Sequence, residues 1–219
     1  MEQQPALLTI GDATPRGAAR GTEDASLRVA AWRRPLPLLT GAYVVLTAAT
    51  MPFFMGDTVG YADAIAQRRF SDFGHFGWYL LGYVASELLT PVVRLVVGAD
   101  PVLDNTLTLI VLNWFAGLAG VLLMYSLVYR LTRATGAAAV ASVALMVSLA
   151  FLNFAQSGCS YVFGMTLLLL GLWVLVRDGD EVRSPARTAL LGGVSLFGAV
   201  AVWFTYVFAV PGALLAPAL

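Results

Sequence analysis

The charged residues of this 219-residue chain are spaced so that long stretches carry none. No Asp, Glu, Lys or Arg occurs in Pro35–Gly56, Asn105–Tyr129, Ala134–Val176 or from Thr188 to Leu219. A helix needs about 20 apolar residues to cross a hydrocarbon core. Hydrophobic residues make up 59% of the chain and charged residues 12%, against roughly 45–50% and 25% in soluble domains. The pattern predicts an all-α integral membrane protein with several spans.

The charge-free runs divide into five expected spans. Ala134–Val176 is too long for one helix, and its polar break at Asn153–Ser160 predicts a helical hairpin. We therefore expect spans at about 35–56, 105–129, 136–154, 161–176 and 188–210. Residues 1–34 are polar and Arg-rich, which predicts a disordered cytoplasmic tail before the membrane domain of 35–219. This tail and the run that follows it are longer than those of a signal peptide, so the first span is expected to be an uncleaved anchor.

The segment Phe76–Val97 is apolar, but its longest charge-free stretch covers only Phe73–Ser86. Stretches of about 10–14 apolar residues are more often interfacial than spanning. If the segment does not span, ten Arg lie inside and three outside; if it spans, six lie inside and seven outside. The positive-inside rule favours the first arrangement. We thus expect a cytoplasmic N-terminus in the plasma membrane, and an outer loop at 57–104 that holds juxtamembrane helices.

Several functional classes receive no support from the composition. The formal net charge is zero, so nothing points to a nucleic-acid partner. One Cys (Cys159) and one His (His75) make an internal disulfide impossible and zinc chemistry improbable. No Gly-rich loop of the Walker or dinucleotide type occurs, so ATP-driven transport and nicotinamide redox chemistry are not indicated.

The expected outer loop holds six of the thirteen acids and the only histidine. Asp57 directly follows the first span, and a short helix with Tyr61 on one side is expected after it. The stretch from Met55-Gly56-Asp57-Thr58 through Tyr61 to Gly74-His75-Phe76-Gly77-Trp78-Tyr79 resembles the N-terminal part of GT-C superfamily membrane glycosyltransferases, the protein-mannosyltransferase-like (family 39-like) group. The resemblance covers roughly residues 35–210, mostly as topology. It departs at Phe76, where the family often has Pro, and at Thr58, where the family often has a second acid.

The resemblance implies sugar transfer from a polyprenyl-phosphate-linked donor to an acceptor on the outer face of the membrane. Asp57 would be the catalytic carboxylate, accepting the acceptor's proton or holding a divalent metal ion (Mg²⁺ or Mn²⁺) against the phosphate. Tyr61, Asp72, His75 and Arg94 would bind substrate, and membrane lipids would surround the chain. One base would suffice for an inverting transfer, whereas a retaining one typically needs a carboxylate nucleophile.

The same residues have structural interpretations. Asp57 or Thr58 could cap the following helix, and Asp72 the next one. Asp63 would lie on a solvated face, about 120° round the helix from Asp57. His75 could be an interfacial histidine without function. Glu87 and Arg94, seven residues apart, share a helical face and could both reach the headgroup layer from a surface helix.

Outside this loop the expected roles are structural. Asn105 and Asn113 are expected to bridge helices and Cys159 to be inert. Aromatic residues near the boundaries are expected to be mostly interface anchors: Trp32, Tyr43, Trp78, Tyr79 and Trp114.

Two other functions remain open on sequence grounds: a multi-span transporter and a non-catalytic membrane scaffold. A transporter usually carries ionisable groups between its spans, and the five expected spans contain none. Family members usually have more spans, so the chain is expected to be an N-terminal fragment of such an enzyme.

Overall fold

The computed structural model describes residues 32–50, 56–70, 73–176 and 184–215, and these residues form helices and turns without a strand. The chain divides into two compact units, Met1–Arg34 and Pro35–Leu219. Nearly all of the first unit, including most of the predicted tail, lies outside the described residues. The all-helical class predicted from the sequence is confirmed for the part of the chain that is described.

The second unit consists of nine α-helices and two 3-10 helices within its described residues. In chain order they are α2 (Pro35–Ala49), α3 (Gly56–Ala66), η1 (Phe73–His75), α4 (Phe76–Val97), α5 (Pro101–Thr132), α6 (Thr135–Val147), α7 (Leu149–Ala155), α8 (Ser160–Leu175), α9 (Pro185–Val202), η2 (Phe204–Ala209) and α10 (Val210–Leu215).

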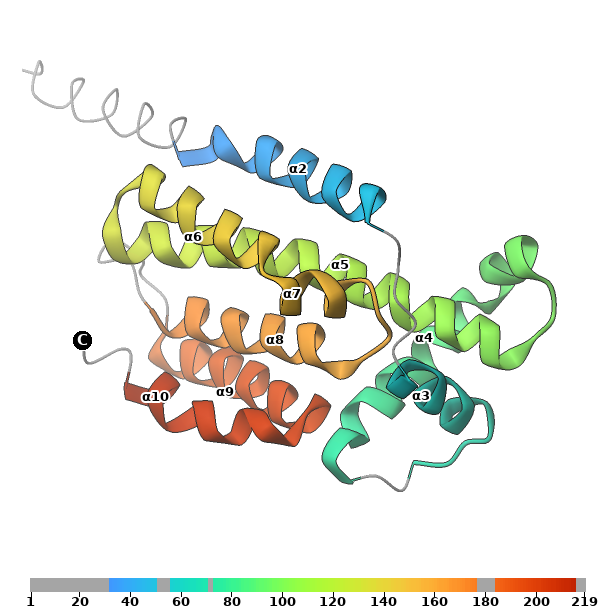
Figure 1. The fold of residues 1–219 in the computed structure, drawn as a ribbon. Helices are drawn as coiled ribbons and strands as arrows, with labels where there is room; N and C mark the ends of the chain where they lie inside the picture. The colour runs from blue at the N-terminus through green and yellow to red at the C-terminus, as the bar shows by residue number, and fades with distance from the viewer. Residues whose placement is uncertain (1–31, 51–55, 71–72, 177–183, 216–219) are drawn as a thin grey trace, which may run out of the picture. The chain divides into compact units, whose positions relative to one another are not determined.

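The long helix α5 organises this unit (Figure 1). It begins sharply because the Asp100 carboxylate accepts the backbone N–H groups of Val102 and Leu103, at 2.9 and 3.2 Å, and Pro101 occupies the first turn. It ends at Arg133, whose left-handed backbone (φ 57°) stops the helix. Its 32 residues extend about 48 Å at 1.5 Å per residue, more than a hydrocarbon core requires.

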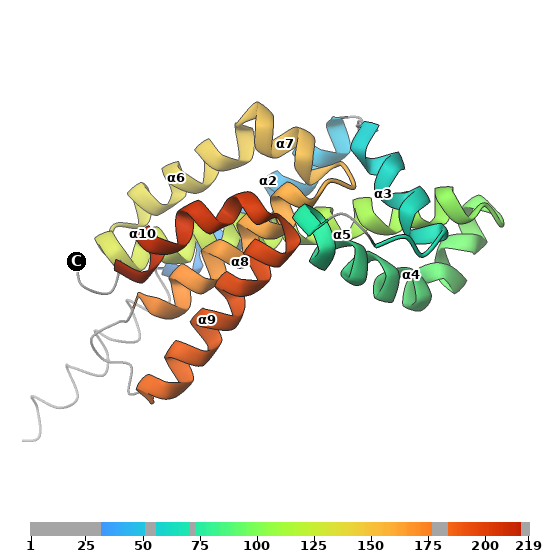
Figure 2. The same ribbon diagram turned by 90° about the horizontal axis from the view of Figure 1, so that it is seen from below.

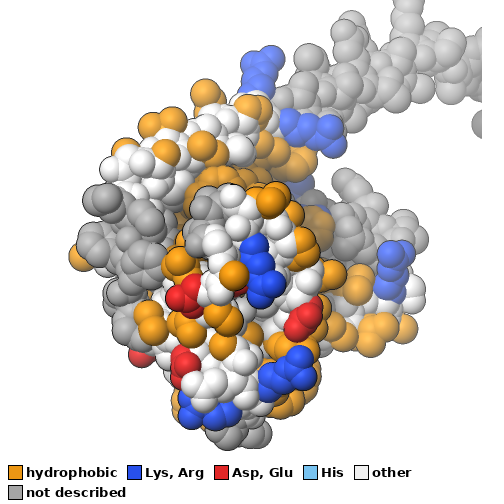
Figure 3. Space-filling view, turned by 90° about the vertical axis from the view of Figure 1, so that its right-hand side faces the viewer, with side chains coloured by type: hydrophobic (Ala, Val, Ile, Leu, Met, Phe, Trp, Pro, Cys, Tyr) orange, Lys and Arg blue, Asp and Glu red, His pale blue; other side chains and the backbone are white. Residues whose placement is uncertain are grey.

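The N-terminal part of α5 packs against a second group of helices, α3 and α4. Helices α6 and α8 pack along α5, while α3 and α4 pack against its N-terminal part (Figures 1 and 2). At this end Arg, Asp and Glu side chains lie among hydrophobic ones on the surface (Figure 3). The N-terminal part of α5 also buries polar side chains: Asp104, Asn105, Thr106 and Thr108.

Two described helices are long and apolar enough to cross a membrane, α5 and α9. Helices α6 and α7 meet at Ser148 with a 66° bend and would make a third span if counted together. The shorter apolar helices are α2, α8 and the η2–α10 pair. These helices support a membrane protein. The count of five spans stays a prediction.

The end of the last expected span differs from expectation. The span expected at about 188–210 ends at Val202, because Trp203 is extended (φ −148°) and η2 then folds back so that α10 contacts α8 (Figure 2). Segment Phe76–Val97 forms the 22-residue helix α4, which packs against α5. It is not among the described helices that are both long and apolar enough to cross a membrane.

Candidate functional site at the start of α3

The turn between α7 and α8 lies inside the protein. All residues from Ala155 to Ser160 are buried. A buried turn must find partners for its backbone polar groups. From α5, Asn113 Nδ2 donates to the carbonyl oxygens of Ser157, at 2.6 Å, and of Cys159. From α4, Trp78 Nε1 donates to the Gly158 carbonyl oxygen at 3.0 Å. The turn is therefore a fixed platform on which helices from distant parts of the chain meet.

Helix α3 meets this platform through Thr58. The Gly158 backbone N–H donates to Thr58 Oγ1 at 3.0 Å, and Cys159 Sγ lies 3.6 Å from the same oxygen. A Cβ at Gly158 would lie 2.5 Å from Thr58 Cγ2 and 2.9 Å from Leu109 Cβ. Only glycine permits so close an approach. The Thr58 hydroxyl thus joins α3 to the turn instead of capping its own helix.

Asp57, next to Thr58, is exposed and lies in the first turn of α3 rather than at its N-cap. A carboxylate there is favoured by the helix dipole. Its charge acts on the groups at the platform. Burial raises the pKa of Tyr61, which lies one turn further along α3; a hydrogen bond with Ser160 lowers it, and the Asp57 charge raises it further. The phenol of Tyr61 therefore stays neutral and able to donate a hydrogen bond.

His75 reaches the platform from η1. Its Nδ1 lies 3.0 Å from Ser160 Oγ, and its ring centroid lies 5.2 Å from that of Tyr61. The imidazole is half-buried. With Nδ1 facing Ser160, Nε2 is the ring nitrogen left for a ligand. The structure thus brings Asp57, Tyr61 and His75, three residues singled out from the sequence, to one place.

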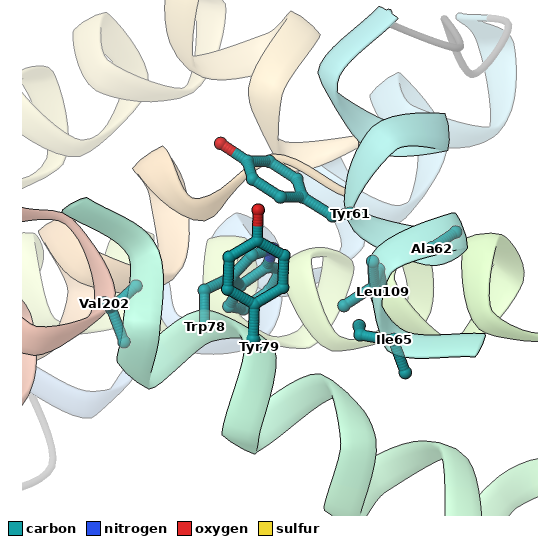
Figure 4. Close-up of a cluster of buried hydrophobic side chains, with 7 residues drawn as sticks. All are labelled: Tyr61, Ala62, Ile65, Trp78, Tyr79, Leu109 and Val202. Atoms are coloured by element: carbon teal, nitrogen blue, oxygen red, sulfur yellow. The ribbon is translucent and has the colours of Figure 1, made fainter. Parts of the chain in front are cut away.

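Tyr61 belongs to a cluster of buried hydrophobic side chains (Figure 4). The rings of Tyr61 from α3 and Tyr79 from α4 meet edge to face, with centroids 5.5 Å apart. The cluster comprises Tyr61, Ala62, Ile65, Trp78, Tyr79, Leu109 and Val202. Trp78, expected to be an interface anchor, is instead fully buried in this cluster, and its indole N–H has its partner in the turn.

The other candidates lie elsewhere. Asp72 is outside the described residues. Asp63 is on the solvated side of α3, where its carboxylate pairs with Arg69 at 2.8 Å. Arg94 pairs through Nε with Asp104 Oδ2 at 3.0 Å. Arg94 comes nineteen residues after His75 along α4, about 28 Å at 1.5 Å per residue, so it does not join the Asp57 group.

Several residues of the platform and of its contacts were not predicted from the sequence as site residues: Thr58, Trp78, Ser157, Gly158 and Ser160. The available signal was the polar, Gly-containing break itself. The roles expected for two asparagines are confirmed, since Asn105 Nδ2 donates to the Ala62 carbonyl oxygen at 3.1 Å and Asn113 joins α5 to the turn. Cys159 is fully buried, and burial raises the pKa of its thiol, as suits an unreactive cysteine.

The residues around Asp57 are a poor donor set for a divalent metal ion. Among the described residues, no three His, Cys, Asp or Glu side chains gather into a metal-binding group. Protein sites for such ions usually supply several oxygen ligands. Asp57 is the one carboxylate that the described residues bring to the platform.

No family model, curated protein or solved structure matches this chain.

Proposed function

We propose that this chain is a GT-C-like membrane glycosyltransferase, which moves a sugar from a polyprenyl-phosphate-linked donor to an acceptor on the outer face of the plasma membrane. The observation that supports the proposal most is the position of Asp57. Its carboxylate is exposed in the first turn of α3, and the next residue, Thr58, is fixed to a buried turn. A neutral phenol and an imidazole lie on the same platform. An accessible base on a rigid support is what acceptor activation requires.

In the proposed reaction Asp57 takes the proton of the acceptor hydroxyl as its oxygen attacks the anomeric carbon of the donor. The bond between that carbon and the phosphate oxygen breaks, and polyprenyl phosphate leaves with the bonding electrons. His75 Nε2 and the Tyr61 hydroxyl are positioned to hydrogen-bond the phosphate or the sugar. Ser160 holds His75 through its hydroxyl, and the His75 ring packs against that of Tyr61, with centroids 5.2 Å apart.

The N-terminus would be cytoplasmic, with α3, α4 and the α7–α8 turn on the outer side. That arrangement brings the site to the membrane surface, where a lipid-linked donor can present its sugar. The exposed apolar side chains of α4 next to the site's helices are consistent with such a position.

The test is sugar transfer by membranes that contain the full chain, given polyprenyl-phosphate donors labelled in a hexose or a pentose. Asp57→Asn should lower the rate by about 10²–10⁴-fold, the range for loss of a general base, without changing protein abundance. Asp63→Asn is the matched control, because Asp63 is a carboxylate of the same helix that faces solvent and Arg69. Its rate should equal that of the parent chain.

Three results would contradict the proposal. Normal transfer by the Asp57→Asn variant would remove Asp57 from catalysis. Movement of the donor across the membrane with its glycosidic bond intact would indicate a transporter. If membranes that contain the parent chain neither consumed nor moved the labelled donors, a non-catalytic scaffold would be favoured.

A further inference from the structure

A pocket of about 160 Å³ lies between α3, α4 and the start of α5, at a distance from Asp57. Its lining is mainly polar and contains charges of both signs: Arg68, Glu87, Arg94 and Asp104. We propose that this pocket binds the headgroup of a phospholipid that carries a primary ammonium beside its phosphate, as in phosphatidylethanolamine. The inference does not depend on the proposed glycosyltransferase activity.

The acidic side of the pocket needs a hydrogen-bond donor. Asp104 is 2% exposed, and its Oδ2 accepts from Arg94 Nε at 3.0 Å, whereas its Oδ1 has no partner. The buried hydroxyl oxygen of Ser86, also in the lining, has no partner either. Buried polar atoms normally find partners. The exposed carboxylate of Glu87 adds a negative charge beside them. An ammonium, with three N–H donors, suits these acceptors.

The basic side of the pocket can hold a phosphate. The Arg68 guanidinium lies over the ring of Tyr83, 5.5 Å from its centroid, and no carboxylate among the described residues is within 4 Å of it. The backbone of Arg68 is left-handed (φ 54°) and ends α3 so that its side chain meets α4. Arg94 uses only Nε for Asp104, so its terminal nitrogens are available. Arginine is well suited to binding phosphate oxygens.

The surface beside the pocket is apolar. Five side chains of α4 are exposed at helical spacing and form one stripe: Leu80, Val84, Leu88, Val92 and Leu95. Glu87 and Arg94 directly precede Leu88 and Leu95, so the stripe borders the pocket. Figure 3 shows hydrophobic side chains among the charged ones at this end of the molecule. A phospholipid whose headgroup carries both signs of charge matches the pocket, and its acyl chains match the apolar stripe of α4. A free sugar or phosphate would leave the stripe without a partner.

The experiment is calorimetric titration of the purified full chain in detergent with dioctanoyl phosphatidylethanolamine, phosphatidylcholine and phosphatidylglycerol. The ethanolamine lipid should bind about 10-fold tighter than the choline lipid, whose nitrogen has no N–H, a difference of about 1.4 kcal/mol. Glu87→Gln should reduce this preference, and Arg68→Gln should weaken the binding of all three lipids. Both residues are exposed, so the variants should fold. Asp63→Asn, a carboxylate of α3 outside the pocket, is the matched control and should bind like the parent chain.

Equal affinity for the ethanolamine and choline lipids would overturn the proposal, as would an unchanged preference in Glu87→Gln. If phosphatidylglycerol bound most tightly of the three, the pocket would recognise the phosphate alone, which would also overturn the proposal. Asp57→Asn should keep the preference, so failure at this pocket and failure of the proposed transferase can be told apart.

Discussion

At the scale of single residues, the contact between Thr58 and Gly158 joins positions one hundred residues apart. It decides where α3 starts relative to the α7–α8 turn and hence where the Asp57 carboxylate is held. The bond is buried, so its loss is not offset by water. The position of the candidate base therefore depends on a glycine that lies far from it in the sequence.

Replacing Gly158 tests this dependence. A methyl group there would meet Thr58 Cγ2 and the Leu109 side chain at less than 3 Å, so Gly158→Ala should lower the stability by about 1–3 kcal/mol through overpacking. Thermal unfolding in detergent measures the change. Gly60→Ala is the control, because nothing lies within 4 Å of the added methyl group and alanine favours the helix by up to about 1 kcal/mol. If both variants unfold at the same temperature, the close approach of α3 and the turn is not real.

At the scale of secondary structure elements, the α7–α8 turn is held mainly from α5. Asn113 is fully buried and gives both its N–H groups to the turn, to the carbonyl oxygens of Ser157 and Cys159. Trp78 of α4 adds a bond to the carbonyl between them. Three successive carbonyl groups of one turn thus have side-chain partners from two other helices.

Asn113→Leu removes both donors at similar volume. Two buried carbonyl groups would lose a partner, which should cost about 2 kcal/mol or more and lower the unfolding temperature. Asn153→Leu is the control, since Asn153 is a half-buried asparagine near the same turn, without a hydrogen bond to another described side chain. An unfolding temperature for Asn113→Leu as high as that of the control would mean that α5 does not hold the turn.

The sequence predicted the helical class, the polar break before α8, and the bridging roles of Asn105 and Asn113, because local composition and charge spacing determine these features. It did not predict the burial of Trp78 or the end of α9 at Val202. Both depend on contacts between distant segments: Trp78 with Gly158, and Tyr206 of η2, whose hydroxyl donates to the Tyr161 carbonyl oxygen at 2.7 Å. Asp57, Tyr61 and His75 were selected from one short stretch, but Ser160, which lies between two of them, comes from another helix.

At the scale of the whole molecule, a site on the outer face requires a particular orientation of α5 in the membrane. This helix is among the described helices that can span by length and composition. If α5 crosses, its two ends lie on opposite sides. In the predicted orientation, the α4–α5 turn at Ala99 would be outside with the candidate site, and the α5–α6 turn at Ala134 would be inside.

Labelling of single cysteines in intact cells with a membrane-impermeant maleimide tests this placement most directly. The sole native cysteine, Cys159, is fully buried, so the parent chain provides a low baseline. Ala99 and Ala134 are both exposed. Ala99→Cys should react in intact cells, whereas Ala134→Cys should react only after the membrane is permeabilised. The opposite pattern, or equal labelling of the two variants in intact cells, would contradict an outer-face site next to Asp57.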